Sequence, residues 1–221
     1  MAKVSIRRNA ILTVTILCMA IFTACGGGSS EGNASEEELS TELLEARGEH
    51  TTTLLPDGRL LAVGGRSDAT SLNSTEIFDP STESWSSAED MEYERFDHSA
   101  VLLKDGRVLI SGGDKMATGG GWQKRDDSTA VKPSALYDPA SGNWATTGST
   151  VNEHGPGHTA TLLDNGQVLI TGGLYEALAE SPREPSLFTE LFDPSTGTWK
   201  NTGDMNEARH RHKAVLLENG N

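Results

Sequence analysis

The feature that most constrains this chain is a sequence pattern that occurs four times. The first copy begins at His50 and ends in a pair of glycines, and further copies begin at His98, His158 and His212. In each complete copy the histidine precedes the first glycine by 14 residues, and an aromatic-Asp-Pro block follows with a tryptophan six residues after its aspartate. Fixed offsets at a period of about 54 residues indicate one supersecondary unit copied along the chain.

Four kinds of residue recur at these fixed positions. Because they recur in every unit, we expect them to serve packing and turn geometry, not ligand contact. These repeat residues are His50, His98, His158 and His212; Gly64, Gly65, Gly112, Gly113, Gly172 and Gly173; Asp79, Asp138 and Asp193; and Trp85, Trp144 and Trp199.

Each unit contains signals for four short strands, which we name A to D. Strands A and B flank an Asp-Gly or Asn-Gly pair such as Asp57-Gly58, which predicts a tight hairpin with a type I′ turn. The B strands, for example residues 168–171 (Val-Leu-Ile-Thr), are almost continuously apolar, as expected of strands covered on both faces. Strand C ends at the aromatic-Asp-Pro block, and strand D begins at the tryptophan.

These motifs resemble the kelch repeat, with its paired glycines, aromatic-Asp-Pro, tryptophan and an Arg-x-x-His that opens each copy. The resemblance covers residues 43–221, with Gly155 in the place of the arginine found at Arg47, Arg95 and Arg209. It implies an all-β, kelch-type β-propeller of about three four-stranded blades plus the start of a fourth, which is an incomplete ring. The expected blade units are about residues 50–97, 98–157 and 158–211, with the next beginning at 212.

The first 24 residues have the pattern of a signal peptide. Lys3, Arg7 and Arg8 precede an apolar run over residues 10–24 that is short for a transmembrane helix. The run ends at Cys25, and this junction resembles the lipobox of bacterial lipoproteins, which implies that Cys25 carries a lipid. Ordinary cleavage at the same place is the alternative. We therefore expect a protein of the bacterial cell envelope, exported and lipid-anchored at the outer membrane or cell surface.

A Gly/Ser/Glu-rich stretch over residues 25–42 is predicted to be a flexible acidic tether. The competing interpretation is a short helix over residues 36–46, where leucines share one face. Removal of residues 1–24 takes away three positive charges and no negative ones, so the net charge changes from −14 to −17. Such an acidic body argues against a nucleic-acid partner.

The connections that vary in length indicate where a ligand would bind. Alternate connections of a four-stranded meander lie on opposite faces, so the long B–C segments (66–74, 114–133 and 174–188) share a face with the D–A connections. Variable loops on a rigid repeat usually carry recognition, so we expect a protein or glycan ligand on this B–C/D–A face. The candidate binding residues are Trp122, Lys124, Arg125, Tyr93, Arg95, Tyr175 and Arg183.

Two of these candidates have structural alternatives. Trp122 is the only tryptophan outside the repeat, and beside Lys124 and Arg125 it would stack on a sugar or aromatic ring, or fold back over its own loop. Arg95 recurs in register with Arg47, which favours a structural hydrogen-bonding role.

The sequence predicts no catalytic residue, metal or cofactor. Close histidine pairs such as His154 and His158 suggest a metal site, but a histidine repeated in every blade is better explained by packing. Nucleophile-elbow and zinc-protease motifs are absent from the sequence.

Three functions compete at this point. The favoured one is a non-catalytic binding module for a protein or glycan. The second is a carbohydrate-active enzyme of the galactose-oxidase-like or sialic-acid-mutarotase kind. Its site would lie in blades outside these residues, because the copper site of galactose-oxidase-like enzymes contains a Tyr–Cys cross-link and Cys25 is the one cysteine left after removal of residues 1–24. The third is a purely architectural envelope protein.

Overall fold

The structure is a computed structural model of the chain, which divides into two units, residues 1–36 and residues 37–221. It describes residues 40–68, 70–116, 129–176 and 183–218, all of which belong to the second unit. The regular elements of these residues are all β-strands. Accordingly, within these ranges there is no helix that would cross a membrane.

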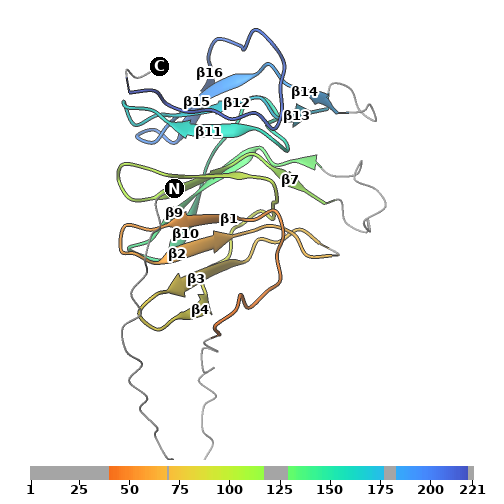
Figure 1. Ribbon diagram of the computed structural model, residues 1–221. Coiled ribbons are helices and arrows are strands. Elements are labelled where there is room, and N and C mark those ends of the chain that lie inside the picture. The colour runs from red at the N-terminus through yellow and green to blue at the C-terminus, as the bar shows by residue number, and fades with distance from the viewer. Residues whose placement is uncertain (1–39, 69, 117–128, 177–182, 219–221) are drawn as a thin grey trace, which may run out of the picture. The chain divides into compact units, whose positions relative to one another are not determined.

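Three four-stranded antiparallel sheets form the described part of the chain, and each is one blade (Figure 1). Blade 1 consists of β1 (Thr51–Leu54), β2 (Leu60–Val63), β3 (Thr75–Asp79) and β4 (Ser84–Ser87). Blade 2 consists of β5 (Ser99–Leu102), β6 (Val108–Ser111), β9 (Pro133–Asp138) and β10 (Asn143–Ser149). Blade 3 consists of β11 (Thr159–Leu162), β12 (Val168–Thr171), β15 (Thr189–Asp193) and β16 (Thr198–Asn201). The predicted all-β class with four-stranded kelch-type blades is confirmed.

Two short hairpins extend the B–C connections beyond the blades. In blade 2, β7 (Asp114–Lys115) pairs with β8 (Thr129–Ala130), and in blade 3, β13 (Leu174–Tyr175) pairs with β14 (Glu184–Pro185). Figure 1 shows β7, β13 and β14 on the same side of the blades. The sequence predicted variable segments here but not their pairing.

The A–B connections are tight turns, but the predicted turn type is wrong. Gly58 has a φ of 91°, whereas Asp57 before it is not among the residues with positive φ, and a type I′ turn requires both. The amide of Gly58 donates to the carbonyl of Leu55 (3.0 Å), so Leu55–Gly58 is a type I turn followed by a left-handed glycine. Gly106 and Gly166 make the same bond to Leu103 (3.1 Å) and Leu163 (2.9 Å), so the turn does not depend on Pro56. The Leu55 amide donates to Arg59 (2.8 Å), so the loop has three residues with the glycine last, a length that favours this turn.

The hydrophobic core lies between the blades, and β6 contributes to both sides of blade 2. Val108 and Ile110 pack with Leu61 of blade 1. Leu109, which alternates with them, packs with Val168 of blade 3. All five side chains are completely buried. At about 1.5–3 kcal/mol for each large aliphatic side chain, this burial stabilises the contact between blades.

The segment before the first blade is extended instead of helical. Ser40 pairs with Trp85 of the edge strand β4, and Leu44 and Glu45 donate their amides to the Glu76 carboxylate (2.7 and 3.0 Å). The helix considered over residues 36–46 is therefore wrong for residues 40–46, and residues 36–39 lie outside the described residues. The strand edge and the buried carboxylate satisfy the backbone groups that a helix would have paired internally.

Candidate functional site

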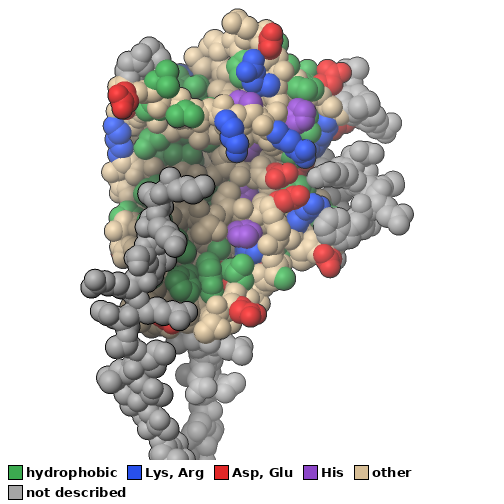
Figure 2. Space-filling model, in the orientation of Figure 1, with side chains coloured by type: hydrophobic (Ala, Val, Ile, Leu, Met, Phe, Trp, Pro, Cys, Tyr) green, Lys and Arg blue, Asp and Glu red, His purple; other side chains and the backbone are tan. Residues whose placement is uncertain are grey.

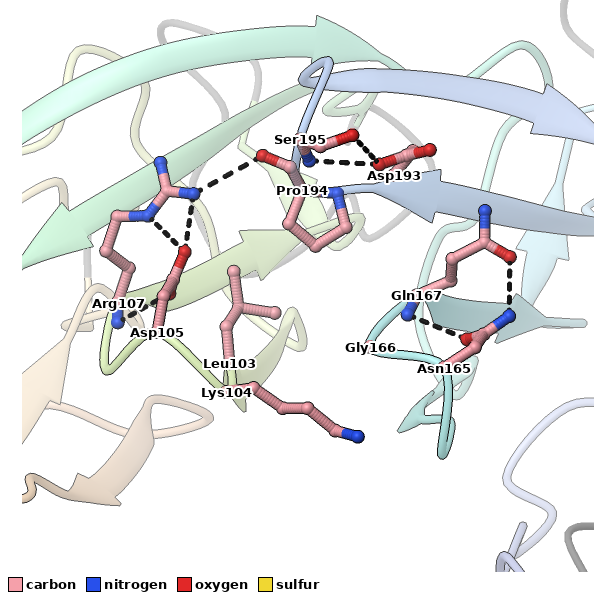
Figure 3. Close-up of a pocket in the computed structure, with 10 residues that line it drawn as sticks. All are labelled: Leu103, Lys104, Asp105, Arg107, Asn165, Gly166, Gln167, Asp193, Pro194 and Ser195. Carbon is pink, nitrogen blue, oxygen red and sulfur yellow. Dashed lines mark hydrogen bonds and ion pairs between the residues drawn. The ribbon is translucent and has the colours of Figure 1, made fainter.

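The A–B and C–D turns share one face, which we call the turn face, and a cleft of about 650 Å³ opens there between blades 2 and 3 (Figure 3). The residues lining it are Leu103, Lys104, Asp105, Arg107, Asn165, Gly166, Gln167, Asp193, Pro194 and Ser195.

The polar groups of this cleft are already paired with one another. Arg107 forms an ion pair with Asp105 (2.7 Å), which holds the pKa of that carboxyl below its usual value, and donates to the carbonyl of Pro194 in blade 3 (3.3 Å). Arg59 makes the same contact with Pro139 one blade earlier (3.3 Å). Because the contact recurs between blades, the cleft is best explained by how one blade joins the next.

The opposite face is built differently, because its B–C segments are joined from blade to blade. The amide of Met116 in blade 2 donates to Ser71 Oγ in blade 1 (2.6 Å). Asp114 in blade 2 forms an ion pair with Arg183 in blade 3. We call the described parts of these segments, residues 66–68, 70–71, 114–116, 174–176 and 183–185, the B–C surface.

Charged side chains of both signs gather on this side of the molecule (Figure 2). Arg66 pairs with Glu49 (2.6 Å) and lies over the Phe96 ring at 5.3 Å. Burial, followed by the charges of Glu49 and Asp114, raises the pKa of Asp97. The B–C surface and the adjoining D–A connections therefore present a mixed-charge, partly buried rim.

The structure separates the predicted binding residues. Tyr93 is 37% exposed, and Tyr175 packs edge-on against Phe188 with ring centroids 5.2 Å apart. Arg183 belongs to the B–C surface through its ion pair. Arg95 is fully buried and donates to backbone carbonyls, so it does not belong to an exposed surface. Cys25, Trp122, Lys124 and Arg125 lie outside the described residues.

The repeated glycine pairs lie where successive blades meet. At Gly112 (φ 62°), an added Cβ would lie 2.6 Å from the carbonyl oxygen of His154, in the D–A connection that leads to blade 3, and 2.7 Å from Cε1 of His158, where the next unit begins. At Gly113 (φ 83°), it would lie 2.8 Å from Cβ of His98, in its own blade. The pair thus fits between two repeat histidines, and only glycine allows both the backbone conformation and the approach.

The repeat histidines also hydrogen-bond to the preceding blade. His98 Nε2 lies 2.8 Å from Thr51 Oγ1, and His212 Nε2 lies 2.8 Å from Thr171 Oγ1. Burial lowers the pKa of His158 to about 4 and that of His98 well below its ordinary value. Within the described ranges no group of three or more His, Cys, Asp or Glu residues is arranged to hold a metal ion.

The repeated aspartates and tryptophans complete each blade. Asp193 Oδ1 accepts hydrogen bonds from the Ser195 amide and hydroxyl (2.9 and 2.6 Å), which closes the C–D turn. Trp199 packs on Phe192 with ring centroids 5.1 Å apart and donates its indole N–H to Ser134 of blade 2 (3.0 Å).

An arginine clamps the D–A connection to each of the first two blades. Arg47 donates to the carbonyl of Gly64 (2.7 Å) and to the buried Glu76 carboxylate (2.6 Å). Arg95 donates to the carbonyl of Gly112 (3.1 Å), and burial lowers its pKa to about 10. We call this arrangement the D–A clamp.

In blade 3 a histidine takes the place of the arginine. His154 Nδ1 lies 2.9 Å from the carbonyl oxygen of Gly172, the equivalent of Gly64, and Nε2 lies 3.3 Å from Glu190 Oε1. The expectation that Gly155 stands in the arginine position is therefore wrong. Gly155 follows His154 as Phe96 follows Arg95, since its amide donates to Leu174 as that of Phe96 does to Asp114, and the extra residue of this connection lies between Gly155 and His158. Counting from the repeat tryptophan instead of back from the repeat histidine would have found His154.

Comparisons with known proteins support the blade architecture. Residues 50–92 match the family model described as the kelch motif. Among curated proteins no significant match was found. The solved structure entitled "Structure of YjhT" matches with a TM-score of 0.55 and 16% identity, covering 75% of this chain and 54% of that one, so the chain spans about half of that structure's length. Residues 50–92 therefore carry a kelch motif, and the described residues form three four-stranded blades of a kelch-type β-propeller.

Proposed function

We propose that this protein is a non-catalytic binding module that takes a protein or glycan ligand on its B–C/D–A face. The observation that carries the proposal is the joining of B–C segments across three blades by Met116–Ser71 and Asp114–Arg183 contacts. These contacts give the long connections a common, supported surface, which is how binding loops are usually presented on a rigid scaffold. On the turn face, by contrast, the contacts between blades repeat in register, as Arg59–Pro139 and Arg107–Pro194, which is typical of a structural role.

A glycan array tests the proposal with the full-length natural protein. Lys104→Ala and Gln167→Ala, on the turn face, serve as matched controls for Trp122→Ala and Arg183→Ala. We expect selective glycan binding that the two B–C variants weaken at least tenfold and the controls leave unchanged. Loss of binding in the controls alone would contradict the proposal.

The same variants distinguish the other candidate functions. Turnover of free sugars that is lost in the Trp122 and Arg183 variants would favour a carbohydrate-active enzyme. An unchanged phenotype in producing cells, together with no ligand, would favour an architectural role.

We also propose that the propeller is exported and anchored to the bacterial envelope by a lipid on Cys25. The support is the order of basic residues, apolar run and Cys25, followed by a Gly/Ser-rich tether. Intact mass of the protein from its own cells tests this: we expect loss of residues 1–24 and an added lipid mass, and Cys25→Ser is expected to release the protein from membranes. A membrane-bound Cys25→Ser protein would contradict lipid anchoring.

A further inference from the structure

The clamp of blade 3 differs chemically from the clamps of blades 1 and 2. An arginine remains charged at all relevant pH values, whereas an imidazole changes its protonation near neutral pH. Both ring nitrogens of His154 face acceptors, the carbonyl of Gly172 and the carboxylate of Glu190. A neutral imidazole has one N–H, so only the imidazolium donates to both.

The Glu190 carboxylate is arranged to remain ionised opposite this ring. Burial alone would raise its pKa, but the hydrogen bonds from His154 and from the Asn152 and Val151 amides bring the pKa below its usual value. Those amides lie 2.7 and 2.8 Å from the carboxylate oxygens. Both His154 and Glu190 have completely buried side chains, so the ring faces a buried carboxylate that needs a counter-charge.

Other titratable and charged groups surround the clamp. The His158 ring lies 6.4 Å away on the same connection and is neutral above its pKa of about 4. Asp114 and Arg183, on the two neighbouring B–C segments, adjoin Gly155 and pair with each other. Glu153 accepts the amide of Glu176 (3.2 Å).

The clamped connection lies between the B–C segments of blades 2 and 3. The carbonyl of His154 accepts the Gly113 amide (3.0 Å), and the Gly155 amide donates to the carbonyl of Leu174 (2.9 Å). A change in the clamp therefore acts directly on the connection that supports both neighbouring segments of the B–C surface.

We propose that His154 makes the blade 3 D–A clamp pH-sensitive: the imidazolium holds residues 151–155 against β12 and β15, and its deprotonation loosens them. Because only the imidazolium donates to both acceptors, we expect the clamp to be closed at acidic pH and to loosen as the pH rises. If the proposed function is correct, ligand binding at this surface weakens over the same pH range.

Amide hydrogen exchange of the full chain, corrected for intrinsic rates, tests the clamp without any ligand. Between pH 5.5 and 8.0 we expect protection of the Val151 and Asn152 amides to fall by about tenfold as the pH rises, the loss expected when a hydrogen bond to a charged group is broken. The equivalent Leu44 and Glu45 amides, held by Glu76 beside Arg47, are expected to keep constant protection.

Two reciprocal variants decide the outcome. His154→Arg is expected to remove the pH dependence from blade 3, and Arg47→His is expected to create it in blade 1. If His154→Arg does not fold, the blade 1 variant provides the same test independently. An identical pH profile in wild type and His154→Arg, or no new dependence in Arg47→His, would overturn the proposal. Because exchange requires no ligand, this failure is distinguishable from a failure of the proposed binding function.

Discussion

Replacing Gly112 by alanine measures how closely successive blades approach at the glycine pair. The left-handed backbone (φ 62°) costs an alanine about 1–2 kcal/mol. The new Cβ would also lie 2.6 Å from the backbone oxygen of His154 and 2.7 Å from the His158 ring, and such overpacking costs about 1–3 kcal/mol more. We therefore expect Gly112→Ala to lower the free energy of unfolding by about 2–5 kcal/mol.

Gly142→Ala is the matched control. Gly142 has a similar φ of 74°, but an added Cβ there would meet nothing within 4 Å. We expect it to lose only the backbone term of about 1–2 kcal/mol. In urea unfolding with equal m-values, a difference of about 1–3 kcal/mol separates the midpoints by about 0.5–1.5 M for an m-value near 2 kcal/mol/M. Equal losses in the two variants would refute the close approach at Gly112.

Three further changes test other contacts between and within blades. Trp199→Phe leaves the buried Ser134 hydroxyl without its indole donor. We therefore expect urea unfolding to show a free energy of unfolding lower by about 1–3 kcal/mol. A change below about 0.5 kcal/mol would exclude this hydrogen bond as a stabilising link between blades. Arg47→Met leaves the buried Glu76 carboxylate without its guanidinium, for which we expect a loss of about 3–5 kcal/mol. Simultaneous Glu76→Gln removes the buried charge but keeps an acceptor for the Leu44 and Glu45 amides, so it should restore part of the loss; no recovery in the double variant would contradict the pairing. Burial lowers the pKa of His158 to about 4, so the unfolded chain binds its proton more readily than the folded one. The free energy of unfolding is therefore expected to be highest above about pH 6.5 and to fall toward pH 4. Unfolding measured across this range tests it, and a flat profile would contradict a neutral buried ring.

The repeat made the blade architecture predictable because the same local chemistry recurs in every unit. A glycine ends each B strand, and a tryptophan packs on the aromatic residue of strand C, as at Phe192 and Trp199. The turn type was missed because an Asp-Gly pair such as Asp57-Gly58 favours type I′ in a two-residue loop, whereas these loops have three residues and form a type I turn that ends in a left-handed glycine.

The candidate site was predictable only as a face. Fixed strand order placed the variable connections on one side, but the ion pair of Asp114 with Arg183 joins residues far apart in sequence and has no local signal. His154 was missed because one inserted residue made two alignments possible, and the histidine-based alignment put Gly155 in the clamp. Side-chain hydrogen bonds, not spacing, distinguish the two alignments.

Photo-crosslinking in producing cells tests the binding face most directly. A benzophenone amino acid is placed at Met116 on the B–C surface and, in a second variant, at Lys104 on the turn face. The account predicts a discrete protein or glycan adduct from position 116 and none from position 104. An adduct from position 104 alone, or none from either position, would contradict a ligand-binding B–C/D–A face.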